Sequence, residues 1–267
     1  MAEPLVSIII PVYNAATHVA KCIETVRRQT YRNIEILLVN DGSSDASGPI
    51  CHMYARVDDR VRVIDKENTG VSATRNLALD LAKGDYIQFA DSDDYLRTNA
   101  TELLVQCAER TKADLVVAAY YRVSRGKTVA FNFLPDGVVM DQEEFARELM
   151  EEPASFYYGV LWNKLYRADI IRENGIRCNT ELAWSEDLLF NLEDIRYAQR
   201  FCGIDTPIYY YINNKGSLVH TQLNLPNIVR TRTKLFSYYR DLYERLGLYE
   251  KYKLQIHKYL ISIAEHV

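Results

Sequence analysis

Asp91, Asp93 and Asp94 place three carboxylates within four positions, directly after the strand-like apolar run at residues 86–90. Carboxylates this close repel one another and raise one another's pKa. A divalent cation removes that cost, because Mg²⁺ and Mn²⁺ bind carboxylate oxygens. Mg²⁺ usually takes only one or two carboxylates from the protein and completes its shell with water and substrate phosphates. We therefore interpret this strand end as a site for a metal ion and a diphosphate.

Other interpretations of these residues have to be weighed. Asp and Ser are common in solvated turns and at helix N-caps, and an isolated Asp-Ser-Asp-Asp is more often one of those. An EF-hand would place Asp91, Asp93 and Glu102 at loop positions 1, 3 and 12, but position 6 then requires glycine and is Leu96. That leucine excludes the EF-hand.

The composition is that of an ordinary globular protein. Of 267 residues, 48% are hydrophobic and 25% are charged, and the net charge of −4 argues against nucleic acid as a partner. No apolar run reaches the roughly 18 residues that span a bilayer, and a strand begins almost at residue 1, so we expect no signal peptide. Five scattered cysteines suit reduced thiols in a cytoplasmic protein rather than a disulfide frame or a zinc site: Cys22, Cys51, Cys107, Cys178 and Cys202.

The elements that carry the acidic run alternate between strand and helix. Apolar runs at 5–12, 34–39, 61–64, 86–91 and 114–121 predict buried strands, and helical periodicity appears between them. This alternation predicts an open, mostly parallel sheet wound with helices. Such sheets bind ligands outside the carboxyl ends of their strands. Three polar clusters, at 11–14, 40–45 and 91–94, fall at those ends and together predict a nucleotide site.

The second half has a looser pattern. We expect strands at 128–133 and 202–212, a helix at 141–151, an aromatic segment of undetermined form at 156–166, and a helix capped by Ser185. From residue 226 two helical segments carry eight Lys/Arg against four acids and run to the last residue without a stop signal, so the native chain could be longer. We expect one catalytic domain at 1–220, with a nucleotide-binding half at 1–122 and an acceptor-side half at 123–220, and a helical extension at 221–267.

Five motifs occur in order along the chain: Pro11-Val12-Tyr13-Asn14, Val-Asn-Asp-Gly-Ser-Ser-Asp at 39–45, Asn68-x-Gly-x-x-x-x-Arg75-Asn76, Asp91-Ser92-Asp93-Asp94 and Ser185-Glu186-Asp187. Together they resemble glycosyltransferase family two, the inverting enzymes of the Rossmann-like GT-A fold, an α/β architecture. The resemblance covers about residues 4–220. The Q-x-x-R-W signature of processive membrane synthases is absent, so the chain looks like a non-processive, bacterial-type enzyme.

The resemblance implies roles for individual residues. Asp187 would be the general base, with Glu186 orienting it or contacting the acceptor. Asp93 would bind the metal, and His220 would complete its shell, which would favour Mn²⁺ over Mg²⁺. The remaining matched positions would bind the nucleotide sugar: Pro11, Tyr13 and Asp41 at the base, Asp91 on the ribose side, Arg75 near the diphosphate, and Asn14, Asn68, Gly70 and Ser92 around them.

Each role has a plainer alternative. Glu186 and Asp187 would also favour a helix N-terminus, and Arg75 could form a simple ion pair. A histidine in a loop, such as His220, is usually exposed. The run 162–164 (Trp-Asn-Lys) could form an acceptor platform or pack in the core, and the three tyrosines at 209–211 could line a sugar site or pack against the sheet.

The sequence therefore predicts a metal-dependent inverting hexosyltransferase. It would move a hexose or N-acetylhexosamine from a UDP-sugar to a hydroxyl of a glycan, lipid-linked or protein-linked acceptor. One competing class is a sugar-nucleotide nucleotidyltransferase, but residues 13–16 contain neither Gly nor Lys for a phosphate loop. Another is a receiver-type domain, which would be about half this length. The basic tail would contact an anionic membrane surface, a second copy of the chain, or only solvent.

Overall fold

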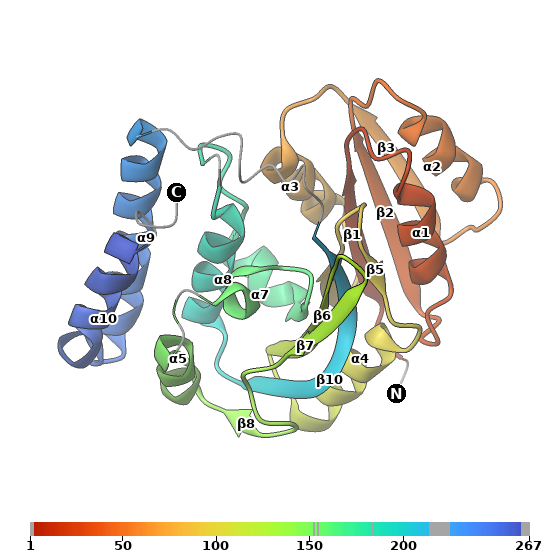
Figure 1. Ribbon diagram of the computed structural model, residues 1–267. Helices are drawn as coiled ribbons and strands as arrows, with labels where there is room; N and C mark the ends of the chain where they lie inside the picture. The colour runs from red at the N-terminus through yellow and green to blue at the C-terminus, as the bar shows by residue number, and fades with distance from the viewer. Residues whose placement is uncertain (1–2, 152, 154, 183, 214–224, 263–267) are drawn as a thin grey trace.

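The computed structural model describes residues 3–151, 153, 155–182, 184–213 and 225–262. In that part of the chain a ten-stranded sheet has helices packed around it, with the central strand order β3-β2-β1-β4-β9-β6-β10-β5 (Figure 1). β7 pairs with β6, and β8 pairs with β10. No helix in the described residues is both long and apolar enough to cross a bilayer.

The first half has the predicted alternation. β1 (Val6–Val12), β2 (Ile34–Asp41), β3 (Val61–Lys66) and β4 (Tyr86–Phe89) are all parallel. β1, β2 and β4 are almost wholly buried, as their continuous apolar runs require. The helices between the strands are α1 (Val19–Arg27), α2 (Ser47–Ala55) and α3 (Val71–Leu81).

The second half extends the same sheet with mixed polarity. β9 (Lys164–Arg167) lies antiparallel between β4 and β6 (Leu115–Ser124), and β10 (Phe201–Ile212) runs parallel to β6. The intervening reversed strand means that β1, β2, β3, β4, β6 and β10 all point the same way, so their carboxyl ends share one edge. The remaining strands are short and antiparallel: β5 (Tyr95–Leu96), β7 (Lys127–Phe131) and β8 (Val139–Met140).

Helices cover this half and lead to the C-terminal segment. They are α4 (Ala100–Thr111), α5 (Gln142–Glu151), α6 (Phe156–Gly159), α7 (Ala168–Glu173), α8 (Glu186–Tyr197), α9 (Leu225–Arg245) and α10 (Tyr249–Ser262). Figure 1 shows α9 and α10 on the side of the molecule away from α1 and α2. Tyr239, Tyr243 and Tyr252 of this pair are buried, and the Tyr243 hydroxyl donates to the Ala146 carbonyl on α5. Much of the tail's aromatic content is therefore used for packing within the chain.

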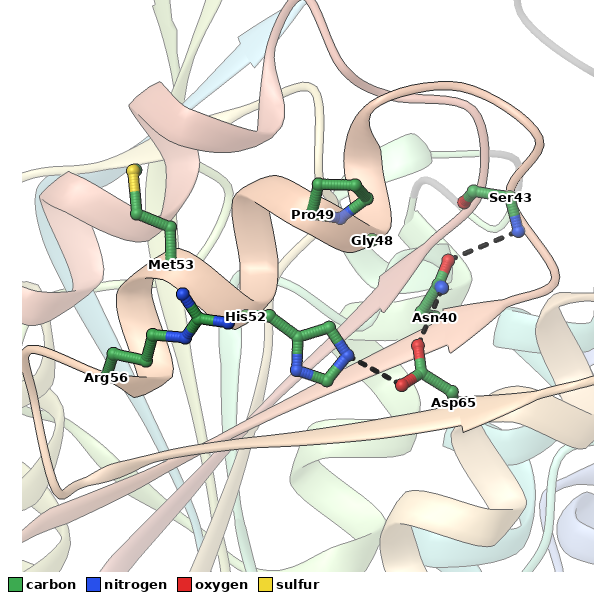
Figure 2. Close-up of a pocket in the computed structure, with 8 residues that line it drawn as sticks. All are labelled: Asn40, Ser43, Gly48, Pro49, His52, Met53, Arg56 and Asp65. Carbon is green, nitrogen blue, oxygen red and sulfur yellow. Dashed lines mark hydrogen bonds and ion pairs between the residues drawn. The ribbon is translucent and has the colours of Figure 1, made fainter.

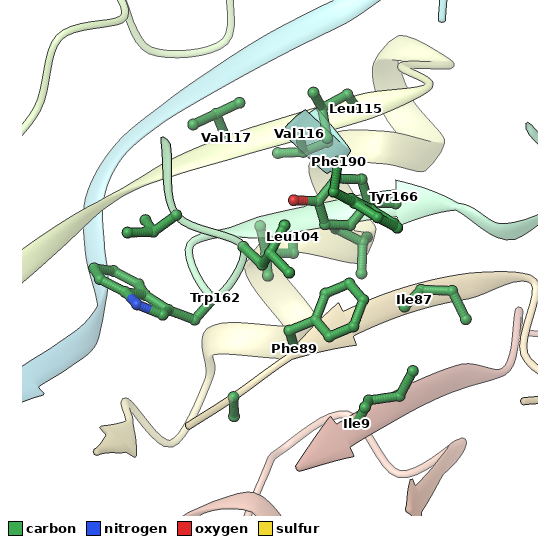
Figure 3. Packing of buried hydrophobic residues seen from close by; sticks show 14 of the residues in the cluster. Ile9, Ile87, Phe89, Leu104, Leu115, Val116, Val117, Trp162, Tyr166 and Phe190 are labelled. Carbon is green, nitrogen blue, oxygen red and sulfur yellow. The ribbon is translucent and has the colours of Figure 1, made fainter. Parts of the chain in front are cut away.

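Three aromatic rings join β4, β9 and α8 in the core. Phe89, Tyr166 and Phe190 meet edge to face, with centroid separations of 5.6–5.8 Å (Figure 3). All three are fully buried, and such pairs stabilise a core beyond their buried area. Because Phe89 lies two residues before Asp91 and Phe190 three after Asp187, this packing sets where the strand end and the helix start lie relative to each other.

Gly84 provides a test of how closely the turn before β4 packs on β1. A Cβ at Gly84 would lie 2.6 Å from the Ser7 amide nitrogen and 2.7 Å from the Tyr86 carbonyl oxygen. Gly84→Ala should therefore lower the free energy of unfolding by about 1–3 kcal/mol, because backbone atoms must move. Urea denaturation followed by circular dichroism measures this.

Gly159→Ala is the matched control. Nothing lies within 4 Å of a Cβ built there, so its effect should stay within about 0.5 kcal/mol. Equal stabilities for the two variants would contradict the close approach of the Gly84 turn to Ser7.

Candidate active site

A buried guanidinium joins the acidic run at the end of β4 to the acidic pair at the start of α8. Arg75 lies on α3 and is 4% exposed. Its Nη2 donates to Asp91 Oδ1 at 3.1 Å, and its Nη1 donates to Asp187 Oδ1 at 2.6 Å and to Glu186 Oε1 at 3.5 Å. Three predicted site carboxylates, from two distant stretches of the sequence, therefore contact one guanidinium, that of Arg75, which was also predicted for the site.

The two helices that supply these groups begin in unusual backbone conformations. Gly70 precedes α3 with φ of 90°, which glycine tolerates without strain. Ser185 precedes α8 with φ of 63°, in the left-handed region that non-glycine residues rarely adopt. Its side chain makes no capping hydrogen bond, so the expectation that Ser185 caps α8 in the usual way was wrong. The left-handed turn instead introduces Glu186 and Asp187 as the first residues of the helix.

Asp187 has the electrostatics of a proton acceptor that works near neutral pH. Burial raises its pKa and the Arg75 guanidinium lowers it, while Glu186 and Asp91 raise it again. The sum is a pKa of about 7. A carboxylate poised in this way can take a proton from a hydroxyl at physiological pH and still be ionised enough to do so.

The three carboxylates of the acidic run have different surroundings. Asp91 pairs with Arg75, and its amide N–H donates to the Tyr209 hydroxyl at 3.0 Å. Asp93 is exposed. Asp94 is 2% exposed, and its Oδ1 accepts the Ile212 amide N–H at 2.7 Å. Burial, then the charges of Asp91 and Asp93, raise the pKa of Asp94 to about 9. The repulsion expected from the sequence therefore adds to burial in raising the pKa of Asp94.

Asp41, predicted to bind the base, is held by its own chain. The Thr69 amide donates to its Oδ1 and the Gly70 amide to its Oδ2, both at 3.0 Å, and the Lys66 ammonium also pairs with Oδ1. Burial would raise the pKa of Asp41, but the Lys66 ammonium and the Thr69 amide outweigh it and lower the pKa. Sequence reasoning missed Lys66, although it ends β3 at the edge where ligands were expected.

The other predicted nucleotide-binding residues lie in the segments at the carboxyl ends of β1, β3 and β4. β1 and β2 place Val12 opposite Asn40, so the two polar loops that follow lie side by side. Asn14, with φ of 46°, accepts the Ser44 amide at its side-chain oxygen and donates its own amide to the Ser43 hydroxyl. Tyr13 is 54% exposed at the surface of this edge. Pro11 and Ser92 are half-buried and Asn68 is exposed.

A cavity beside α2 does not coincide with the acidic cluster. It measures about 520 Å³ and lies between α2 and the ends of β2 and β3. In Figure 2, Asp65 contacts both Asn40 and His52, at 2.8 Å and 2.7 Å. Asn40 points toward α2, whereas Asp41, the next residue, binds the residues that precede α3. This cavity is therefore on the opposite face of the sheet from Arg75.

Residues 162–164 and Tyr209 belong to the core. Trp162, Asn163 and Lys164 are at most 2% exposed, and Trp162 stacks on Tyr209 with ring centroids 4.3 Å apart. Tyr209 is also buried. Of the two interpretations for these segments, packing therefore holds for Trp162–Lys164 and for Tyr209.

Asn191 holds α8 against the α6 segment by hydrogen bonds, a role that the sequence analysis did not predict. It is fully buried one turn after Asp187, where its oxygen accepts the Tyr166 hydroxyl at 2.6 Å. Its Nδ2 donates to the carbonyls of Tyr158, Gly159 and Val160. The sequence signal was weak, because Asn191 is one polar residue in the largely apolar run Leu188–Leu192.

The acidic run suits a cation that is shared with a substrate. Among the described residues no group of three or more His, Cys, Asp and Glu is arranged to hold a metal alone. Carboxylate oxygens at Asp91 and Asp93 are nevertheless the donor type that Mg²⁺ and Mn²⁺ take alongside substrate phosphates. His220, the predicted third ligand, lies outside the described residues.

Comparison with known proteins gives a consistent result. The sequence model of the family described as Glycosyl transferase family 2 matches residues 7–173, a range that ends before Glu186 and Asp187. Among curated relatives, EpsJ of Bacillus subtilis, an uncharacterized glycosyltransferase, is 36% identical over 80% of this chain, and the chain spans only 63% of that protein. EpsH of the same organism, also named a glycosyltransferase, is 34% identical over 91% of this chain and 68% of its own length.

Solved structures agree on the fold. TarS 1–349 of S. aureus in complex with UDP-GlcNAc superposes with a TM-score of 0.72 at 20% identity, covering 95% of this chain and 79% of that one. The mannosyltransferase PcManGT of Pyrobaculum calidifontis, in complex with GDP-Man and Mn²⁺, gives a TM-score of 0.60 at 15% identity, covering 99% and 76%. The fold is the α/β architecture of these enzymes, the predicted GT-A fold. The chain belongs to glycosyltransferase family 2.

Proposed function

We propose that this chain transfers a hexose or N-acetylhexosamine from a UDP-sugar, with inversion, to a hydroxyl of a glycan, lipid-linked or protein-linked acceptor. The observation that carries the proposal is the Arg75 bridge. One side of it, Asp91, belongs to the acidic run expected to face the donor, and the other, Asp187, is the expected base. A single guanidinium thus couples the donor side of the site to the proton acceptor.

Asp187 acts as the base in this proposal. It removes the proton from the acceptor hydroxyl as that oxygen attacks the anomeric carbon from the face opposite the nucleotide. Arg75 holds one carboxylate oxygen at 2.6 Å and leaves the other for the hydroxyl. Glu186, which contacts the same guanidinium, keeps the base oriented. General base catalysis of this kind contributes roughly 10²–10⁴-fold to the rate.

Donor binding is assigned to the loops at the ends of β1, β2 and β4. Asp41, Tyr13, Pro11 and Asn14 surround the base, and Asn68, Gly70, Asp91 and Ser92 complete the donor side. A divalent cation held by Asp93, with His220 as a further ligand, would neutralise charge on the departing diphosphate when bound. The UDP-GlcNAc bound to TarS supports UDP as the nucleotide, and the GDP-Man bound to PcManGT makes guanine the alternative to test.

Calorimetry with UDP tests the donor assignment. UDP should bind at least about tenfold more tightly with Mn²⁺ than with EDTA, because the cation screens the repulsion between the diphosphate and the acidic run. GDP under the same conditions is the control for the base. Affinity for UDP that is unchanged by the metal, or a preference for GDP in a hydrolysis screen of nucleotide sugars, would contradict this assignment.

Replacement of the base separates binding from chemistry. Asp187→Asn should reduce transfer by about 10²–10⁴-fold and leave UDP affinity within about threefold, because the amide retains the shape but accepts no proton. Glu193→Gln, on the same helix and in a half-buried pair with Arg196, is the matched control and should keep full activity. Transfer by Asp187→Asn at a rate near that of the unaltered chain would remove Asp187 as the base.

The pH dependence follows from the raised pKa of Asp187. A base must be ionised to act, so the pKa of about 7 predicts that transfer falls as pH drops below 7 and levels off above it. The acid limb should lose about tenfold per pH unit. A kcat profile from pH 5 to about 9 at saturating donor measures this, with UDP binding at each pH as the control. A flat profile down to pH 5 would show that Asp187 is ionised throughout or is not the base.

A further inference from the structure

A second cavity, of about 310 Å³, lies on the β6–β7 hairpin. We call it the hairpin pocket; it is lined by Arg122, Ser124, Arg125, Lys127, Val129 and Phe131. It therefore contains three cations beside two apolar side chains. Figure 1 shows the hairpin next to β10, away from β1, β2 and β3.

The cations of the hairpin pocket form no ion pair among the described residues. In an acidic chain, residues 115–135 contain three cations and no Asp or Glu. Within the described part of the chain no carboxylate forms an ion pair with Arg122, Arg125 or Lys127, although many other arginines are paired. Arg122 packs its guanidinium over the rings of Phe131 and Phe156, at 4.8 Å and 5.8 Å, and its Nε is buried without a hydrogen-bond partner among the described residues. The Arg122 side chain also interacts with the hydroxyl of Tyr120, which carries no negative charge.

The turn at the tip of the hairpin holds a cation in a costly conformation. Ser124 pairs with Lys127, so the loop is the two residues Arg125 and Gly126, with φ of 48° and 76°. Two positive φ values in such a loop favour Asn-Gly or Gly-Gly. An arginine there carries a conformational cost that a solvent-facing turn does not require. The backbone thus fixes Arg125 beside the mouth of the hairpin pocket.

The hairpin pocket lies at the same sheet edge as the proposed catalytic groups. Arg122 pairs across the sheet with Tyr211, and the next residue of β10, Ile212, donates its amide to Asp94 at 2.7 Å. The pKa of Tyr211, raised mainly by burial, responds both to Arg122 and to the three carboxylates of the acidic run. A ligand held in the hairpin pocket therefore extends toward the acidic cluster from the side opposite the nucleotide loops.

We propose that the hairpin pocket binds an anionic group, a phosphate or a carboxylate, carried by the acceptor close to the hydroxyl that is glycosylated. This inference rests on the proposed function and narrows its acceptor to an anionic class. Charge-assisted bonds from two guanidiniums and an ammonium fix the anion, and Phe131 and Val129 cover the apolar part of the group that bears it.

The test titrates the full chain, saturated with UDP and Mn²⁺ so that the donor site is filled, with three probes: glucose 6-phosphate, glucuronate and glucose. We expect glucose 6-phosphate or glucuronate to bind at least about tenfold more tightly than glucose, with chemical-shift changes at the amides of residues 122–129. The stronger of the two identifies phosphate or carboxylate as the group. The affinity should also fall as NaCl is raised from 0.05 M to about 0.5 M.

Three variants complete the test. Arg122→Gln should lower the affinity for the anionic probe by about tenfold. The double variant Arg125→Gln/Lys127→Gln should lower it by a similar factor, and its two side chains are exposed, so they can be changed without disturbing the core. Arg62→Gln, an exposed arginine on β3, is the matched control and should have no effect. Equal affinity for glucose and the anionic probes, or an equal loss in all variants, would overturn the inference. UDP affinity is measured for each protein. If the unaltered chain does not bind UDP, the donor assignment is contradicted and the hairpin pocket is not.

Discussion

The site depends on one buried guanidinium that balances three carboxylates from two other elements. Arg75 links α3 to the end of β4 and to the start of α8. Removing one partner of a buried ion pair typically costs about 3–5 kcal/mol, because the remaining charges lose their compensation. The planar fork of arginine also matters, since Nη1 and Nη2 address Asp187 and Asp91 separately, which the point charge of a lysine could not do. Stability of the fold and geometry of the proposed chemistry are therefore set by the same contact.

That contact is only as rigid as the helix that carries Asp187. α8 is held by Phe190 in the aromatic cluster and by Asn191, which binds three successive carbonyls of the α6 segment. Lys164 binds the same segment, donating to the carbonyls of Tyr157 and Val160. Asn191 and Lys164 thus form a network of buried hydrogen bonds next to the start of α8, and each broken bond there would leave a costly unsatisfied polar group.

Sequence patterns predicted the half of the fold in which apolar runs are long and continuous. Strands such as Val6–Val12 are buried on both faces, so composition alone identifies them. β9 escaped prediction because Lys164–Arg167 is short and its burial depends on β4 and β6, which are remote in sequence. For the same reason Lys66 and Asn191 were missed: a single polar residue acquires a role only when distant strands or helices converge on it. Motifs singled out the acidic residues and Arg75 for separate roles, but that they meet at one guanidinium was seen only in the structure, and the left-handed Ser185 turn that presents two of them follows no local pattern.

The fold reduces the repulsion among the carboxylates of the acidic run, the feature from which a metal site was first inferred. Three adjacent carboxylates could have required a cation merely to fold. Instead Asp91 is paired with Arg75, and Asp94 is buried against the Ile212 amide with its pKa raised to about 9, so that it is largely protonated and neutral at pH 7. Asp93 is the exposed member of the run. In the proposed function, a cation bound at this run would gain affinity when substrate phosphates supply further ligands. Such an arrangement would couple metal binding to donor binding, which a complete protein cage would not do.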